Sequence, residues 1–241
     1  MSVWARLAGA AAGLADNAHI ASPVRWLLEA FAGGHSSHHD SDSGAQHQVA
    51  FTIGVIALGA KMAKADGIVT RDEVVAFKEV FKVPDGEMEN VSRIFNLAKQ
   101  DIVGYEAYAN QLASLLKGNR KLLEDVLEGL FHIAMADGVF HPNEEQFLAD
   151  VAQCFGFTPT EFNYFKARHV GTVEVDPYEV LGITPEIDND TLKHHYHQLM
   201  LENHPDRMIA RGVPPEFVSL ATKKVAAINA AYRELAKERS I

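Results

Sequence analysis

Two stretches of the sequence repeat one pattern, and this repeat constrains the fold more than any other feature. Residues 49–64 and residues 120–136 are apolar on nearly every side of a helix, and each leads into Ala-Asp-Gly, at Asp66 and Asp137. A helix that is apolar all round is usually buried at the centre of a domain. The repeat therefore predicts a domain of two related halves, each with one central helix. Glycines that cost helix stability but let these central helices come close are Gly54, Gly59 and Gly129.

The rest of this region also has helical spacing. Apolar residues recur every three or four positions in further stretches at residues 71–82, 87–100, 104–117, 143–155 and 158–168. No stretch shows convincingly the two-residue alternation that is typical of a half-buried strand. We therefore predict an all-α fold class, with a helical bundle of two pseudo-repeats over residues 49–170.

A further helical region near the C-terminus is interrupted by a proline. Apolar residues recur at helical spacing before it, at Leu192, Tyr196, Leu199 and Met200, and after it, at Phe217, Ala221, Val225, Ile228, Tyr232 and Leu235. Pro205 cannot continue a helix, and it biases His204 towards an extended backbone. We therefore expect a small helical hairpin whose tip is a loop that holds an imidazole and the carboxylate of Asp206.

Four blocks follow one another in this C-terminal region. They are Asp176-Pro177-Tyr178-Glu179-Val180-Leu181-Gly182-Ile183, Leu192-Lys193-x-x-Tyr196, His204-Pro205-Asp206 and Ala227-Ile228-Asn229-Ala230-Ala231-Tyr232. Together they resemble the J-domain, the DnaJ-type module that recruits DnaK-type chaperones and triggers their ATP hydrolysis. The tripeptide alone is a weak signal, but the four blocks in order over residues 176–241 are a strong one.

The resemblance implies which residues meet the chaperone. The chaperone-binding residues are His204, Pro205, Asp206, Lys193, His197 and Arg207. In the family the aspartate pairs with an arginine at the junction of the chaperone's nucleotide-binding domain and linker, and the preceding helix presents a Lys/Arg-rich face. Here imidazoles replace much of that charge, so we expect weaker electrostatic steering, with stimulation that rises as the pH falls towards 6. The alternative is that His194, His195 and His197 are merely solvated surface residues.

The repeat region resembles a second family. Lys61-Met62-Ala63-Lys64-Ala65-Asp66-Gly67 and its looser copy from His132 to Gly138 are similar to the TerB-like fold of tellurite-resistance proteins. A TerB-like domain followed by a J-domain is the architecture of DjlA-like co-chaperones. We therefore divide the chain into residues 1–48, with apolar helices and a His/Ser/Asp-rich linker, residues 49–170, the TerB-like domain, and residues 171–241, the J-domain.

The repeated acids are candidates for a cation site. Each copy places a glutamate seven residues after the aspartate, which pairs Asp66 with Glu73 and Asp137 with Glu144. The preceding positions lack the acidic ligands of an EF-hand loop. Chain turning explains these acids without a metal, because glycines end the central helices and a capping box or Pro142 begins the next ones. We expect no cofactor, and the alternative is that the two acidic corners converge on one divalent cation, as is suspected of TerB-like proteins.

Composition excludes several function classes. The net charge of −10 argues against nucleic-acid binding. The single cysteine, Cys154, excludes an intramolecular disulfide and fits a reducing compartment. No Ser/His/Asp triad order, Walker loop or glycine-rich dinucleotide turn is present, so we expect no enzyme. Basic residues of the last helix that we expect on a solvated face are Lys223, Lys224, Arg233, Lys237 and Arg239.

The N-terminal stretch raises the question of a membrane. Residues 1–33 contain two short apolar segments with Trp4 and Trp26, but Arg6 and Asp16 interrupt any transmembrane span. The family's usual N-terminal membrane span is therefore not expected. Packing on the core is favoured over contact with a membrane surface, because the polar faces have few Lys and Arg residues. We expect a cytoplasmic protein, with attachment at the periphery of the inner membrane as the alternative.

The functional prediction joins these readings. We expect a J-domain co-chaperone that recruits a DnaK-type chaperone and stimulates its ATP hydrolysis, while the TerB-like domain directs clients or location. The alternative is a metal-responsive or tellurite-stress TerB-like protein with an accessory J-domain. Cation binding at Asp66 and Asp137 without stimulation of a chaperone would favour the alternative.

Overall fold

The structure is a computed structural model, and it describes residues 43–65, 86, 88–100, 104–170 and 176–241. The bundle comprises α3 (Ser43–Ala65), α5 (Met88–Gln100), α6 (Tyr105–Leu115), α7 (Arg120–Ala134), α8 (Pro142–Cys154) and α9 (Pro159–His169). The C-terminal part comprises α10 (Pro177–Leu181), α11 (Asn189–Glu202), α12 (Pro205–Ala210), the 3-10 helix η2 (Pro215–Phe217) and α13 (Val218–Glu238). All regular elements in these ranges are helices, which confirms the predicted all-α class.

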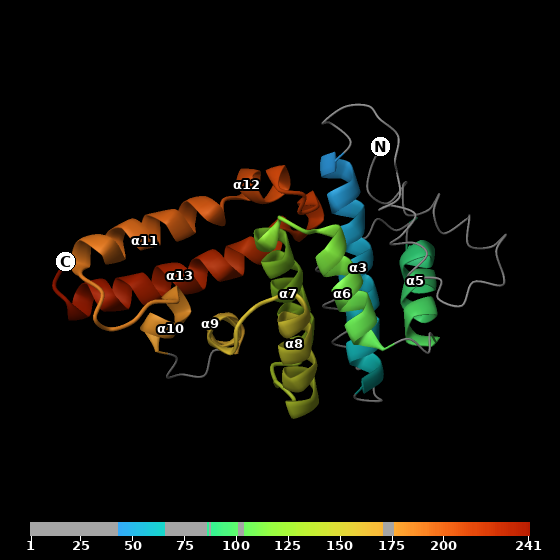
Figure 1. Cartoon of the computed structure of the whole chain (residues 1–241). Coiled ribbons are helices and arrows are strands. Elements are labelled where there is room, and N and C mark those ends of the chain that lie inside the picture. Colours follow the sequence, from blue (N-terminus) through green and yellow to red (C-terminus); the bar gives the residue numbers. More distant parts are fainter. Residues whose placement is uncertain (1–42, 66–85, 87, 101–103, 171–175) are drawn as a thin grey trace.

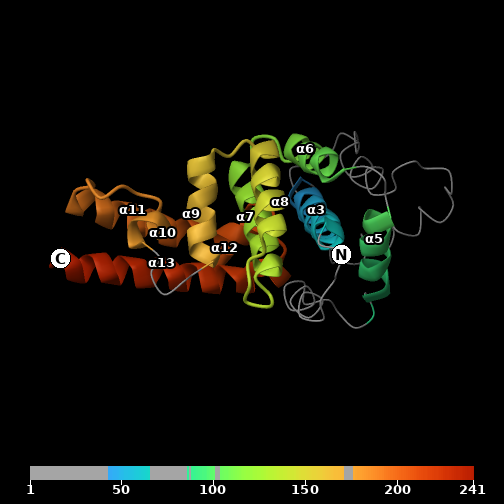
Figure 2. The same ribbon diagram turned by 90° about the horizontal axis from the view of Figure 1, so that it is seen from below.

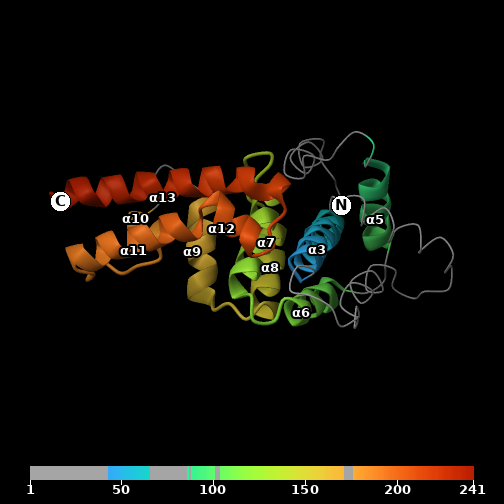
Figure 3. The ribbon, with the colours of Figure 1, turned by 90° about the horizontal axis from the view of Figure 1, so that it is seen from above.

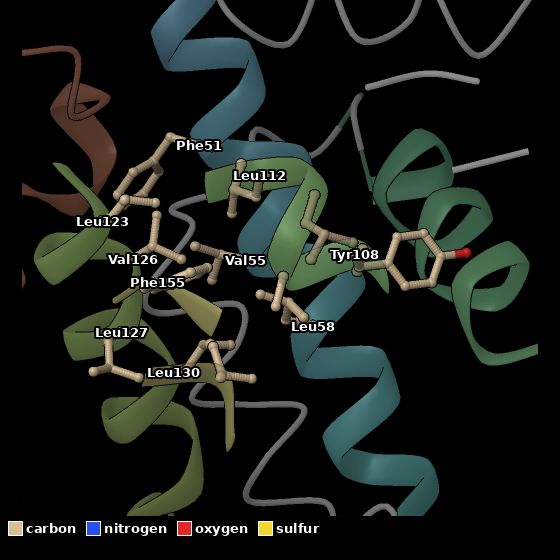
Figure 4. Close-up of a cluster of buried hydrophobic side chains, with 14 of the residues drawn as sticks. Phe51, Val55, Leu58, Tyr108, Leu112, Leu123, Val126, Leu127, Leu130 and Phe155 are labelled. Atoms are coloured by element: carbon tan, nitrogen blue, oxygen red, sulfur yellow. The ribbon is translucent and has the colours of Figure 1, made fainter. Parts of the chain in front are cut away.

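The bundle is built around α3 and α7, the two helices that the repeat predicts to be central. They pack against each other, and α5, α6 and α8 surround them. Figure 4 shows the side chains of their shared core, which include Phe51, Val55, Leu58, Tyr108, Leu112, Leu123, Val126, Leu127, Leu130 and Phe155. Each fully buried Leu, Val or Phe side chain contributes about 1.5–3 kcal/mol, so this core is the main source of stability in the bundle.

The glycines of α3 lie against different neighbours. A Cβ built on Gly59 would meet Ile133 Cδ1 of α7 at 3.5 Å, as expected for close central helices. A Cβ on Gly54 would instead lie 2.4 Å from Leu112 Cδ2, so this glycine admits α6 rather than α7. The expectation for Gly54 was therefore wrong about the partner helix.

Helix α3 also begins earlier than the apolar pattern suggested. It starts at Ser43, so residues 43–47 are helical and do not belong to the expected linker. The apolar segments of residues 1–33, and residues 71–82, lie outside the described residues. None of the helices in the described ranges is long and apolar enough to cross a membrane.

The C-terminal part is a helical hairpin of α11 and α13, which extends away from one side of the bundle in all three ribbon views (Figures 1, 2 and 3). Asp188 begins α11, because its carboxylate accepts the backbone N–H groups of Asp190 and Thr191. Between the helices, Tyr196 stacks on Tyr232 with ring centroids 3.9 Å apart. The buried residues that hold the hairpin together are Val180, Leu181, Leu192, Leu199, Ile228, Ala231 and Leu235.

The near end of this hairpin is packed into the bundle. Met208, Val213 and Phe217 are buried in the bundle core rather than in the hairpin core. Phe217 meets Phe51 of α3 edge to face, with ring centroids 4.8 Å apart. Figure 3 shows α12 and the start of α13 beside α7. The turn between α11 and α13 is therefore anchored in the bundle core, while the two helices themselves pack together in the hairpin core.

Candidate functional site

The His-Pro-Asp tripeptide lies at the junction of α11 and α12. His204 is the N-cap of α12, with φ −66° and ψ 136°, and Pro205 is its first helical residue. The ring Nδ1 of His204 accepts the backbone N–H of Asp206 at 3.3 Å. We expected a loop here, but a short helix begins directly at the proline. The reason is that proline disrupts a helix interior but suits the first helical position, where its missing N–H is not needed.

This tip is open to solvent. The side chain of His204 is 58% exposed and that of Asp206 is 89% exposed, and the two groups lie 3.7 Å apart. Because Nδ1 already accepts a backbone N–H, the neutral ring has no proton on that nitrogen to donate to the carboxylate. Pro205 and Arg207 are exposed as well. The carboxylate of Asp206 is thus presented outward and is available to a cationic partner.

The exposed face of α11 carries the side chains that the sequence placed there. Lys193, His194 and His197 are exposed. His195 differs from the expectation, because it is half-buried and its Nε2 contacts the carbonyl oxygen of Leu181 at 2.8 Å. This imidazole therefore joins α11 to α10 instead of contributing to the outer face.

Two apolar side chains near the tip were not singled out by sequence reasoning. Leu201 is 56% exposed near the end of α11, and Ile209 is 39% exposed in α12. Both lie within five residues of Pro205, on either side of it along the chain. Helical spacing did not predict that these two side chains are exposed, because their exposure depends on the direction in which α12 leaves α11. They add apolar surface beside the charged tip.

Arg211, at the end of α12, connects the tip to the bundle. Its Nε and Nη2 donate to the two carboxylate oxygens of Asp125 on α7, at 2.5 and 2.8 Å. Its Nη1 donates to the carbonyl oxygen of Glu202, the last residue of α11, at 2.7 Å. Burial raises the pKa of Asp125 above its ordinary value, although the guanidinium pulls in the opposite direction. No sequence signal identified this pair, since its members are 86 positions apart.

A buried cluster of charges lies between α7 and α13. Lys224 Nζ is 2.7 Å from Glu124 Oε1 and 2.8 Å from Glu128 Oε1. Arg168 and His169 of α9 also pair with Glu128. These contacts join the hairpin to the bundle through three helices.

The charges in this cluster hold one another ionised. Burial alone would raise the pKa of Glu124, but Lys224 and Lys121 hold it at about 2. Burial would lower the pKa of Lys224, but Glu124 and Glu128 raise it above its ordinary value. Burial would also raise the pKa of Glu128, but Lys224, His169 and Arg168 hold it well below its usual range. Glu124, Glu128 and Lys224 are therefore ionised at neutral pH.

The expected solvated basic face of the last helix was wrong for two residues. Lys224 is buried, with only 5% of its surface exposed. Arg239 donates to the carbonyl oxygens of Ile187 and Pro185 and to the hydroxyl of Tyr178. Lys224 therefore joins α13 to the bundle, and Arg239, directly after α13, joins the end of that helix to α10 and the segment that follows α10.

The candidate cation residues are only partly described. Asp66 and Glu73 lie outside the described residues. Asp137 Oδ1 accepts the backbone N–H of Val139 at 2.8 Å, and Glu144 is buried and accepts the backbone N–H of His141 at 3.0 Å. Within the described part of the chain, no three His, Cys, Asp or Glu side chains are grouped as metal ligands would be.

The geometry and the sequence together define the class of protein. Residues 52–167 match the family model described as tellurite resistance protein TerB, and residues 176–240 match the model of the DnaJ domain. The chain is thus a J-domain protein with a TerB-like domain in front of the J-domain. No solved structure matches this chain significantly.

Three curated relatives, each named co-chaperone protein DjlA, place the chain more narrowly within this class. The chain is 30% identical over 200 residues to the co-chaperone protein DjlA of Coxiella burnetii, and the aligned region covers 75% of this chain and 74% of that protein. It is 28% identical over 220 residues to the DjlA of Photobacterium profundum, which covers 80% of this chain and 79% of that protein. With the DjlA of Escherichia coli K12 it shares 31% identity over 169 residues, 60% of this chain and 62% of that protein. The chain belongs to the DjlA family of J-domain co-chaperones.

Proposed function

We propose that this co-chaperone recruits a DnaK-type chaperone through the tip of its J-domain and stimulates the chaperone's ATP hydrolysis. The observation that carries the proposal is the outward carboxylate of Asp206, which is 89% exposed next to His204 at the junction of α11 and α12. A rigid hairpin presents this single charge at a fixed place. The function needs no cofactor of the chain's own.

The chemistry is that of an interface rather than of a catalytic centre. A carboxylate that pairs with an arginine or lysine gains most when the partner surface removes water from around it. Lys193 of α11 adds a positive charge, and Arg207 adds another beside the tip. His194 and His197 stand on the exposed face of α11 in place of further Lys or Arg residues, so we expect weak electrostatic steering towards an acidic surface.

The direct test measures the ATPase rate of a purified DnaK-type chaperone with and without the full chain. The wild-type chain is expected to raise the rate, and Asp206→Asn to abolish the increase without loss of helical signal. Asp190→Asn is the matched control, because Asp190 is an exposed aspartate in the same J-domain, at the far end of α11. Stimulation that survives in the Asp206 variant contradicts the proposal.

The remaining parts of the function concern the TerB-like domain and the compartment. We propose that this domain directs clients or location while the J-domain acts on the chaperone. The cytoplasm suits the proposed reaction, because it consumes ATP, and the free thiol of Cys154 suits a reducing compartment. Cross-linking of clients by the full chain, compared with Asp206→Asn, separates client binding from chaperone stimulation.

A further inference from the structure

One guanidinium links both ends of the tip to the TerB-like domain. Arg211 contacts Glu202 O, two residues before His204, and both carboxylate oxygens of Asp125. The side chains are 13% exposed for Arg211 and 3% exposed for Asp125. A bidentate pair of this kind fixes the orientation of the arginine side chain as well as its distance, because the planar guanidinium must be coplanar with the carboxylate. The tip is therefore held by a residue of another domain.

Further contacts at the same place make the attachment rigid. The side-chain amide of Asn119, which caps α7, donates to the carbonyl oxygen of Arg211 at 2.9 Å. Gly212 has φ +106°, and a Cβ there would lie 2.6 Å from His47 Cβ of α3. Val213 is fully buried in the bundle core. The chain leaves the tip through a passage that only a glycine fits.

We propose that Asp125 of the TerB-like domain, acting through Arg211, is a positioning residue for the His-Pro-Asp tip. The bundle sets the direction in which Asp206 meets the chaperone, so that the TerB-like domain takes part in stimulation itself. This inference rests on the proposed function and deepens it. The pair orients the tip and does not cover it, because His204, Pro205, Asp206 and Arg207 are all exposed while it is formed.

The first test needs no chaperone. Amide hydrogen exchange is measured in the full-length wild-type chain and in Asp125→Asn, which keeps the side-chain shape but removes the charge. The Met208 and Gly212 amides, which donate to the carbonyl oxygens of His204 and Ile209, are expected to exchange about fivefold faster in the variant. Amides of the α11–α13 core, such as that of Leu199, are expected to be unchanged.

The second test measures maximal ATPase stimulation and the concentration that gives half of it. We expect Asp125→Asn and Arg211→Lys each to lower maximal stimulation about fivefold. The double variant should lower it no further, because each single change already removes the same Arg211–Asp125 pair. Lys224→Met is the control, because it weakens the attachment of α13 to α7 without contact to the tip. It is expected to lower stability but to keep maximal stimulation.

The outcomes separate this inference from the function on which it rests. If the wild-type chain stimulates and the folded Asp125 variant stimulates equally well, the positioning role is wrong and the proposed function stands. Increased stimulation in the variant also overturns the inference, since the pair would then restrain the tip. If the wild-type chain does not stimulate, the proposed function fails. If an Asp125 variant loses its fold, Arg211→Lys, which retains the positive charge, decides between these outcomes.

Discussion

The buried cation Lys224 allows the energetic role of the domain junction to be measured. In Lys224→Met the side chain stays unbranched and is one atom shorter, but Glu124 and Glu128 lose the ammonium that lies 2.7 and 2.8 Å from them. Removal of one partner of a buried ion pair costs about 3–5 kcal/mol. Glu124 keeps Lys121 at 2.8 Å, and Glu128 keeps Arg168 at 3.4 Å. We therefore expect a loss near the lower end, about 3 kcal/mol of unfolding free energy.

The pKa of Glu124 supports the same magnitude. A carboxyl held at a pKa of about 2, from an ordinary 4.5, is stabilised in its ionised form by about 3 kcal/mol. Lys121 contributes part of this, and Glu128 adds a second carboxylate that depends on Lys224. The ion-pair argument and the pKa of Glu124 therefore lead to the same expected loss, about 3 kcal/mol.

The assay is urea unfolding of the full chain, followed by helical circular dichroism. Lys237→Met is the matched control, because Lys237 lies on the same helix and is exposed. We expect its stability to change by less than about 0.5 kcal/mol. Equal stability of the Lys224 and Lys237 variants at pH 7 would refute the reasoning.

The effect of Lys224→Met should also depend on pH in a defined direction. The pKa of Glu124 is lower in the folded state than its ordinary 4.5, so its contribution is fully present above that pH. The contribution is lost as the pH falls from 4.5 towards 2, because protonation then removes the charge that Lys224 stabilises. The difference between variant and wild type is therefore expected to shrink between pH 5 and pH 3. A difference that stays constant over this range contradicts the assignment.

Three further substitutions test the packing of the fold by urea unfolding. Gly182→Ala should cost about 1–2 kcal/mol, because the residue caps α10 at φ +70°, where an L side chain is strained. Tyr196→Phe should cost about 1 kcal/mol, since it removes a 2.7 Å hydrogen bond to α13 but keeps the ring stack. Gly54→Ala should cost about 1–3 kcal/mol, because its Cβ would lie 2.4 Å from a methyl group of Leu112. Gly86→Ala is the control for Gly54→Ala, because a Cβ on Gly86 would meet open space, and its expected change is below about 0.5 kcal/mol. Equal costs for Gly54→Ala and Gly86→Ala would contradict the packing argument.

The sequence by itself determined most of the longer helices and the place of the His-Pro-Asp tripeptide between two of them. Apolar spacing predicted α8 and α9 within a few residues, because a helix must turn one stripe of side chains towards the core whatever its neighbours are. The residues of α7, apolar on nearly every side, predicted that helix equally closely. The exposure of Lys193 and His197 follows from the same spacing within α11. These properties depend on residues three or four positions apart, which the sequence shows directly.

Only the tertiary structure decided which charges meet. Asp125 and Glu124 stand in a helix that reads as apolar and central, and their partners Arg211 and Lys224 lie 86 and 100 positions away. The sequence alone placed Lys224 on a solvated face, because a lysine is costly to bury unless an anion is supplied from elsewhere. The placement of α13 against α7 brings Glu124 and Glu128 to Lys224. The same helix α7 supplies Asp125, which binds Arg211 at the end of the tip. Pairings of this kind depend on how whole helices are placed, which local spacing does not encode.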